Sequence, residues 1–247
     1  MKNKSAFFIL VLVLTLFYTD LYARKIELIY VNFPPYEDHV NGKPAGILVR
    51  IVEQAFKRAD IAYRLTFFPF KRGYNLVKDG KYDGLFNFYK IEKRLAYFDY
   101  STPIIKNPLV FFVRKDSTLR YQSLDDLKGK KIGVMIGYTY GSKFDDDENI
   151  IKDAAAEHVH HLRKLVLGRL DAYPCDKMVG IYIARKEGLM GELKILPVPL
   201  KIMNGYIGFT KGRHTLVIKK INQQIKYMKN NGEINQIINN YIIRNKF

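Results

Sequence analysis

The sequence predicts a mixed α/β protein built from two units. Segments rich in β-branched and apolar residues alternate with segments whose apolar residues recur at helical spacing. The alternation restarts after residues 119–127, where Ser123 is the expected N-cap of a helix, and a new strand begins at Lys131. Strands that alternate with helices favour mainly parallel sheets, and the restart favours two such units.

The first unit contains three predicted strands and two predicted helices. Residues 26–31 are apolar and β-branched, which predicts a strand. Residues 46–59 carry their apolar side chains on one helical face. Residues 62–68 alternate up to a proline and predict a second strand, residues 71–78 predict a helix followed by glycine, and residues 83–88 predict a short buried strand.

The rest of the chain follows the same two patterns. Short apolar runs between turn residues predict strands at 109–113, 131–136, 170–173 and 206–210. Helical spacing predicts helices at 157–167, 176–186, 216–229 and 233–243.

Composition bounds the possible functions. The chain has 247 residues, of which 48% are hydrophobic, and this is compatible with a packed core rather than disorder. The net charge of +17 is spread over the whole chain, and no nucleic-acid-binding motif accompanies it. We therefore expect no nucleic-acid partner.

The N-terminus has the layout of a secretory signal peptide. Lys2 and Lys4 precede an apolar run over residues 6–17, and Ala23 ends the segment with a small residue. A run of about 12 residues is too short to span a bilayer comfortably. We expect residues 1–23 to be removed near Ala23 and the mature chain to be periplasmic. Its one cysteine, Cys175, is expected to be a structural thiol.

An ordered set of short motifs resembles a known family. The motifs are PPY at 34–36, GKPAG at 42–46, KDGKYDG at 78–84, EKR at 92–94, FDYSTP at 98–103, LDDLKGKKIGV at 124–134 and GRLDA at 168–172. Together they resemble the extracellular solute-binding proteins that capture polar amino acids for ABC transporters, and the resemblance covers residues 26–241.

The resemblance implies a two-lobed periplasmic-binding-protein type II fold, with two hinge crossover strands near residues 106–110 and 203–207. Lobe one is expected to comprise residues 24–108 and 205–247, and lobe two residues 109–204. Ligand is expected in the cleft between hinged lobes. The resemblance also implies an ABC transporter permease as partner, a monomer, and no cofactor.

Three residues carry the expected chemistry. Arg94 matches the arginine that binds the ligand carboxylate, and a guanidinium forks onto both oxygens. Thr139 matches the residue that offers a hydroxyl and a backbone N–H to the same carboxylate. Asp176 matches the carboxylate that receives the ligand ammonium. The structural alternatives are a surface arginine and two helix N-caps.

The walls of the cleft are expected to be aromatic and polar. Phe33 and Phe70 match positions that sandwich the ligand side chain, and Tyr36 and Tyr138 are expected to line the same cleft. Arg72 is expected either to hold a second anionic group or to be a solvated helix residue.

The sequence departs from the family pattern at two places. Small hydroxyl residues commonly precede the arginine, and here Asn87, Tyr89 and Ile91 stand instead. Asn87 and Tyr89 are still expected to contact the ligand, since Tyr89 can donate a hydrogen bond, whereas Ile91 cannot. The first strand also lacks the acidic residue that some members use for the ligand ammonium, and Tyr30 or a near neighbour stands there. Carboxylate capture is therefore better supported than ammonium capture, and the ligand is either an amino acid or a related carboxylate.

Other functions were weighed against ligand capture. His158, His160 and His161 invite a metal hypothesis, but no partner motif accompanies them, so we expect exposed histidines and no metal. Residues 145–148 are acidic but lack the spacing of a calcium loop. The fold also carries cyclohexadienyl dehydratases, for which Asp176 or Glu92 is the available general acid, and a sensory binding protein is a third hypothesis.

Overall fold

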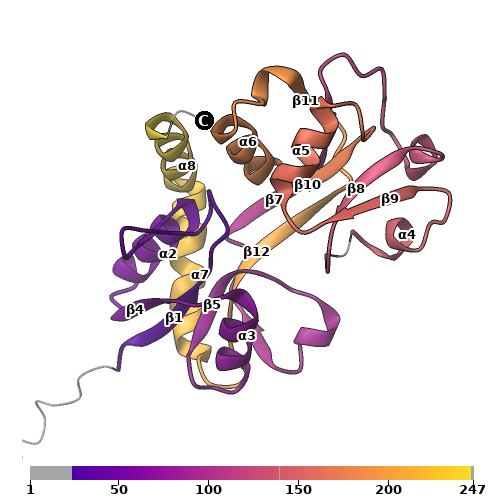
Figure 1. Cartoon of the computed structure of the whole chain (residues 1–247). Helices are drawn as coiled ribbons and strands as arrows, with labels where there is room; N and C mark the ends of the chain where they lie inside the picture. The colour runs from indigo at the N-terminus through magenta and orange to yellow at the C-terminus, as the bar shows by residue number, and fades with distance from the viewer. Residues whose placement is uncertain (1–23, 139, 246–247) are drawn as a thin grey trace, which may run out of the picture.

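The computed structural model describes residues 24–138 and 140–245. They form two α/β lobes linked by two long strands (Figure 1). Residues 1–23, for which a signal peptide is predicted, lie outside this range. No helix among the described residues combines the length and the hydropathy needed to cross a bilayer.

Lobe one is assembled from both ends of the chain. Its parallel strands are β4 (Tyr63–Phe67), β1 (Ile26–Tyr30) and β5 (Gly84–Tyr89), in that spatial order. Its helices are α2 (Ile47–Arg58) and α3 (Phe70–Lys78), followed at the end of the chain by α7 (Thr215–Asn230) and α8 (Glu233–Arg244). The C-terminal helices α7 and α8 pack against α2, so the first and last segments share one lobe (Figure 1).

Lobe two is formed by the middle of the chain. Strands β8 (Lys131–Met135) and β9 (Ile151–Ala155) pair in parallel, and β10 (Tyr173–Asp176) and β11 (Leu193–Ile195) both pair with β7 (Ile105–Arg114). The helices are α4 (Ser142–Asp145), α5 (His158–Val166) and α6 (Lys177–Lys186).

The lobes are linked by β7 (Ile105–Arg114) and β12 (Lys201–Thr210), which run antiparallel between them (Figure 1). Their paired register joins Ile105 to Gly205 and Leu109 to Lys201. Since β12 also pairs with β5 and β7 with β10, one mixed sheet runs through both lobes.

Short elements complete the fold. Strands β2 (Asp38–Val40) and β3 (Lys43–Ala45) form a hairpin, and β6 (Phe98–Tyr100) pairs with β12. The 3-10 helices are η1 (Glu92–Arg94), η2 (Leu124–Leu127) and η3 (Met190–Glu192).

The predicted elements are largely confirmed, with two corrections. The strand expected at 170–173 is wrong, because β10 begins only at Tyr173 and Leu170 lies in the irregular segment before it. The expectation of mainly parallel sheets is also wrong, because both crossover strands make antiparallel pairs with their neighbours. The predicted strands at 109–113 and 206–210 are the C-terminal parts of longer crossover strands.

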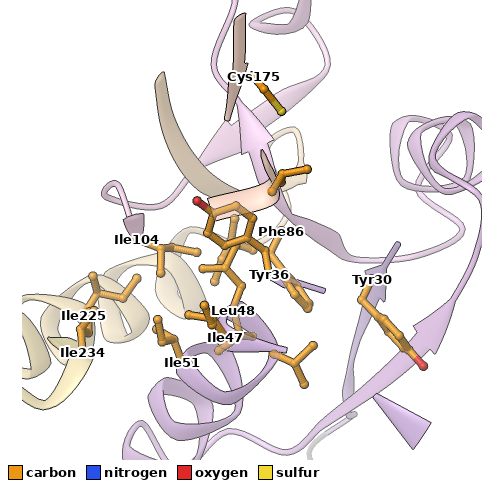
Figure 2. Close-up of a cluster of buried hydrophobic side chains, with 14 of the residues drawn as sticks. Tyr30, Tyr36, Ile47, Leu48, Ile51, Phe86, Ile104, Cys175, Ile225 and Ile234 are labelled. Atoms are coloured by element: carbon orange, nitrogen blue, oxygen red, sulfur yellow. The ribbon is translucent and has the colours of Figure 1, made fainter. Parts of the chain in front are cut away.

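Helix α2 is at the centre of the hydrophobic core of lobe one. Ile47 and Ile51 of α2 lie in one buried cluster with Ile225 of α7 and Ile234 of α8 (Figure 2). Fully burying such a side chain contributes roughly 1.5–3 kcal/mol. The same cluster includes Tyr36 and reaches Cys175 of lobe two, so the core is continuous past the hinge.

Candidate functional site

Four strand ends and the turns that follow them hold several of the predicted site residues. The turn that contains Phe33 and Tyr36 follows β1, the turn that contains Arg94 follows β5, the turn of Tyr138 follows β8, and Asp176 ends β10. The C-terminal ends of strands in open α/β sheets are where ligands bind. Thr139 lies outside the described residues, so its role in carboxylate binding stays a prediction.

Arg94 ends η1 and is half-buried. Its Nη1 donates a hydrogen bond of 3.0 Å to the backbone carbonyl of Tyr89. Within the part of the chain that the structure describes, no carboxylate forms an ion pair with this guanidinium. Burial lowers the pKa of Arg94 from its ordinary value. An arginine keeps its charge even so, because its ordinary pKa lies far above neutrality.

Aromatic rings surround the Arg94 guanidinium. The central carbon lies 4.3 Å from the centroid of Phe88, 5.7 Å from Tyr74 and 5.8 Å from Phe70. Each such contact stabilises a cation by about 0.5–2 kcal/mol. The rings hold the guanidinium without using its N–H donors, of which Nη1 binds the Tyr89 carbonyl.

Asp176 presents the opposite situation. Its side chain caps α6, with Oδ1 accepting hydrogen bonds of 3.0 Å from the backbone N–H groups of Met178 and Val179. Oδ2 accepts one of 3.1 Å from Asn107 Nδ2, and the Tyr36 hydroxyl lies 3.0 Å from Oδ1 and 3.2 Å from Oδ2. A carboxylate has about four acceptor positions, and here four donors face it.

The environment of Asp176 is also dry. The residue is 8% exposed. Burial raises the pKa of Asp176 above its usual range, and the hydrogen bonds from Val179, Asn107, Tyr36 and Met178 oppose that increase. The helix-cap interpretation of Asp176 is therefore confirmed, and the ligand role stays a prediction.

Tyr36 reaches Asp176 from lobe one. Its side chain is fully buried, and its ring lies 5.8 Å from that of Phe33 in a stacked arrangement. Figure 2 shows Tyr36 within the core cluster, whereas the hydroxyl of Tyr30 points away from that cluster. The sequence predicted Tyr36 as a cleft-lining residue, and the structure assigns its hydroxyl a bond between the lobes.

Gly46 fixes the backbone beneath Tyr36. Its φ of 118° is open mainly to glycine, and a Cβ there would lie 2.3 Å from the carbonyl oxygen of Tyr36. The same carbonyl accepts a hydrogen bond from the N–H of Leu48 at the start of α2. The PPY turn and the first helix are thereby locked together.

Tyr89 binds Arg94 and lies near Asp176. Its carbonyl binds Arg94, while burial and then the Asp176 charge raise the pKa of its phenol. The Tyr89 side chain thus lies within electrostatic range of Asp176. Asn87, two residues earlier, has a φ of 51° where β5 and β12 lose register, so β5 bulges beside the hinge.

Phe33 and Tyr138 line a shared cavity between the lobes. This cavity has a volume of about 470 Å³ and includes Met135, His158 and Val179 in its lining. Tyr138 is 54% exposed and packs edge-on against His158. The prediction that these two aromatics face one interlobe space is consistent with this geometry.

Phe70 and Arg72 occupy the start of α3. Phe70 is 47% exposed, with its ring beside Arg94. Arg72 is exposed, with its guanidinium 4.9 Å from the centroid of Phe68. The described contacts bring Phe70 to the Arg94 side of the site and do not bring Arg72 there.

The histidine expectation needs a correction. His161 is fully buried, with Nε2 2.9 Å from the carbonyl of Val134, and His158 is partly buried beside Tyr173 and Cys175. Only His160 of the three is exposed. Among the described residues, no group of three or more histidines, cysteines and acidic residues is placed to hold a metal.

Three contributing residues escaped sequence reasoning. Tyr74 lies one helical turn after Phe70, a spacing that could have identified it as a second aromatic on that face. Phe88 lies between Asn87 and Tyr89 in β5, and in the sequence it cannot be distinguished from an ordinary buried strand residue. Asn107 is a polar residue in an apolar crossover strand, which is the signal that could have found it.

These features define a two-lobed α/β protein with a half-buried arginine on one lobe and a buried, helix-capping aspartate beside the hinge on the other. Residues 28–244 match the bacterial extracellular solute-binding proteins, family 3, and the chain belongs to that family.

Individual relatives agree with this assignment. The chain is 25% identical to the probable amino-acid-binding protein YxeM of Bacillus subtilis, over 84% of this chain and 79% of YxeM. It is 23% identical to the L-cystine-binding protein TcyJ of Escherichia coli, over 82% and 76%. The solved structure of AbpA from Streptococcus pneumoniae, an amino acid ABC transporter substrate-binding protein bound to L-arginine, has a TM-score of 0.69 at 20% identity, with 90% of this chain and 95% of AbpA covered. At that identity the last likeness shows the fold alone.

Proposed function

We propose that this chain is a periplasmic binding protein that captures a small carboxylate-bearing ligand, an amino acid or a related acid, and delivers it to an ABC transporter permease. The observation that carries the proposal is the Arg94 guanidinium, which is held by aromatic faces and one carbonyl while its other donors face no carboxylate among the described residues. The names of YxeM and TcyJ support an amino acid as the ligand.

Binding begins at Arg94 on lobe one. The guanidinium takes both oxygens of the ligand carboxylate in a planar fork. Phe70 and Phe33 contact the remainder of the ligand, and Thr139 of lobe two adds a donor to the same carboxylate. A charged hydrogen bond of this kind contributes roughly 1.5–3 kcal/mol.

The hinge on which the lobes close is formed by the two crossover strands. The paired segments of β7 and β12 are where the chain passes between the lobes. Gly205 lies there with no room for a side chain, since a Cβ would stand 2.8 Å from Asn87 Oδ1 and 3.1 Å from Ile105 Cγ2. We place the lobe boundaries within these segments, at residues 108/109 and 204/205, and take the monomer as the working unit.

The test is a thermal-shift screen of the purified mature chain against amino acids and small carboxylates. A ligand that binds only the folded state raises the melting temperature. For each ligand found, calorimetry on Arg94→Ala should show affinity reduced by at least about tenfold, or about 1.4 kcal/mol. Arg72→Ala is the matched control and should bind within about twofold of wild type. Unchanged affinity in Arg94→Ala would refute the proposal.

One observation favours a second function. Burial raises the pKa of Asp176, and a protonated carboxyl is what a dehydratase needs as general acid. Against it, four donors already face that carboxylate. Turnover of prephenate or arogenate by the purified chain would establish the enzyme, and its absence at high enzyme concentration would exclude those two substrates.

A further inference from the structure

The Tyr36 hydroxyl stands in front of the Asp176 carboxylate. It lies 3.0 Å from one carboxylate oxygen and 3.2 Å from the other, so one donor bridges both. This bridging position is the one that a ligand ammonium would take to be neutralised by Asp176. The remaining directions are used by Asn107 and by the N–H groups of Met178 and Val179.

Moving Tyr36 aside is costly. The side chain is fully buried in the core cluster, and its ring stacks with Phe33. Rotating a buried aromatic ring out of a packed core leaves a cavity and loses its contacts. The backbone beneath it is fixed by the close approach of Gly46. The hydroxyl is therefore held in place within lobe one. Asp176 lies beside the hinge, where it pairs with Leu109 of crossover strand β7.

A ligand ammonium would then find the Asp176 carboxylate covered by the neutral Tyr36 phenol. Burial raises the pKa of Tyr36 well above its ordinary value, so this phenol stays neutral. Glu37 does not replace Asp176 as the anion. It is fully buried, its Oε2 accepts the N–H of Val31, and burial raises its pKa well above the usual range.

We propose that Tyr36 is a specificity-determining residue that shields Asp176 and relaxes the demand for an α-ammonium group. The cleft then accepts α-hydroxy acids about as well as the amino acids with the same side chain. This inference rests on the proposed function, in which Arg94 binds the carboxylate that both ligand classes share.

The test compares matched ligand pairs by calorimetry. Each L-amino acid is paired with the α-hydroxy acid of the same configuration and side chain, such as aspartate with malate or phenylalanine with phenyllactate. For the wild-type chain, the dissociation constants within a binding pair should agree within about threefold. In Tyr36→Phe, the amino acid should gain and be favoured by at least about tenfold, because Asp176 becomes open to the ammonium.

Tyr30→Phe is the matched control. Its hydroxyl is also buried in lobe one but is bonded to His39 Nδ1 and points away from the cluster (Figure 2). This variant should keep the wild-type ratio. The isosteric Asp176→Asn, in the wild-type background, should change the affinity for amino acids by less than about threefold.

The outcomes separate the two proposals. A wild-type preference of about tenfold or more for the amino acid, or an unchanged ratio in Tyr36→Phe, overturns the shielding role of Tyr36 and leaves carboxylate capture intact. Failure of every pair to bind the folded wild-type chain overturns carboxylate capture and this inference with it. The wild-type ratio and Asp176→Asn decide the matter if Tyr36→Phe does not fold.

Discussion

Arg94 on lobe one and Asp176 on lobe two are the two charged groups expected to clamp the ligand, and their surroundings differ. Arg94 is half-buried, held by ring faces, and uses one N–H on a carbonyl. Asp176 is buried and meets four donors, one of which crosses from the other lobe. The cation is positioned but available, whereas the anion is already satisfied by the protein.

The difference shows that a residue at a family motif position need not have the binding role that the motif implies. A buried charge needs partners, and the protein supplies them for Asp176. Asp176 serves as a helix cap and an interlobe contact, and we expect ligand recognition in this chain to depend mainly on the carboxylate side.

The largest effect is expected from breaking the support of the interlobe contact. Gly46→Ala places a Cβ 2.3 Å from the Tyr36 carbonyl oxygen at a φ of 118°. Strain of this kind, together with the forced backbone shift, should lower the free energy of unfolding by about 3 kcal/mol. Denaturant titration followed by circular dichroism measures the change.

Gly42→Ala is the control for that experiment. Gly42 also has a positive φ, of 76°, but a Cβ there would meet nothing within 4 Å. It should lose only about 1 kcal/mol. An equal decrease in the free energy of unfolding in the two variants would show that the contact with Tyr36 does not contribute to stability.

A smaller effect, on the pH dependence of stability, is expected from the burial of His158 in lobe two. Burial lowers the pKa of His158 from its ordinary value to about 4. Between about pH 6.5 and pH 4 the unfolded chain binds a proton that the folded chain does not, so stability falls as the pH is lowered. We expect His158 to account for about 1 kcal/mol of the loss between about pH 7 and pH 5.5.

His158→Asn should remove that part of the pH dependence. The exposed His160 provides the matched variant, since His160→Asn should leave the pH dependence as in wild type. Denaturant unfolding at each pH, with identical slopes for the three proteins, isolates the contribution of His158. Parallel pH profiles for wild type and His158→Asn would mean that the side chain is solvated.

Local sequence signals predicted most of the fold. Helical periodicity with flanking glycines located α2, α5, α6, α7 and α8 within one or two residues of their observed ends. Strand pairing was less accessible, because the antiparallel pairing of β7 with β12 joins segments about a hundred residues apart. Short strands such as β2 and β6 carry too few residues to show a period.

The site was predictable as a set of turns but not as a network. Motif position predicted Arg94, Tyr36 and Asp176 individually. The bond between Tyr36 and Asp176 spans 140 positions in the sequence, and no local pattern encodes it. The same holds for Asn107 of crossover strand β7, whose amide donates a hydrogen bond to Asp176, 69 positions away in the sequence.

The central claim, that Arg94 recognises the ligand carboxylate, is tested most directly by changing both partners in one thermodynamic cycle. A ligand from the screen and its primary amide are titrated calorimetrically into wild type and into Arg94→Ala at one salt concentration. We predict that wild type binds the acid at least about tenfold more tightly than the amide, and that Arg94→Ala binds the two within about twofold. If Arg94→Ala discriminated acid from amide as strongly as wild type, another group would be binding the carboxylate and the account would be contradicted.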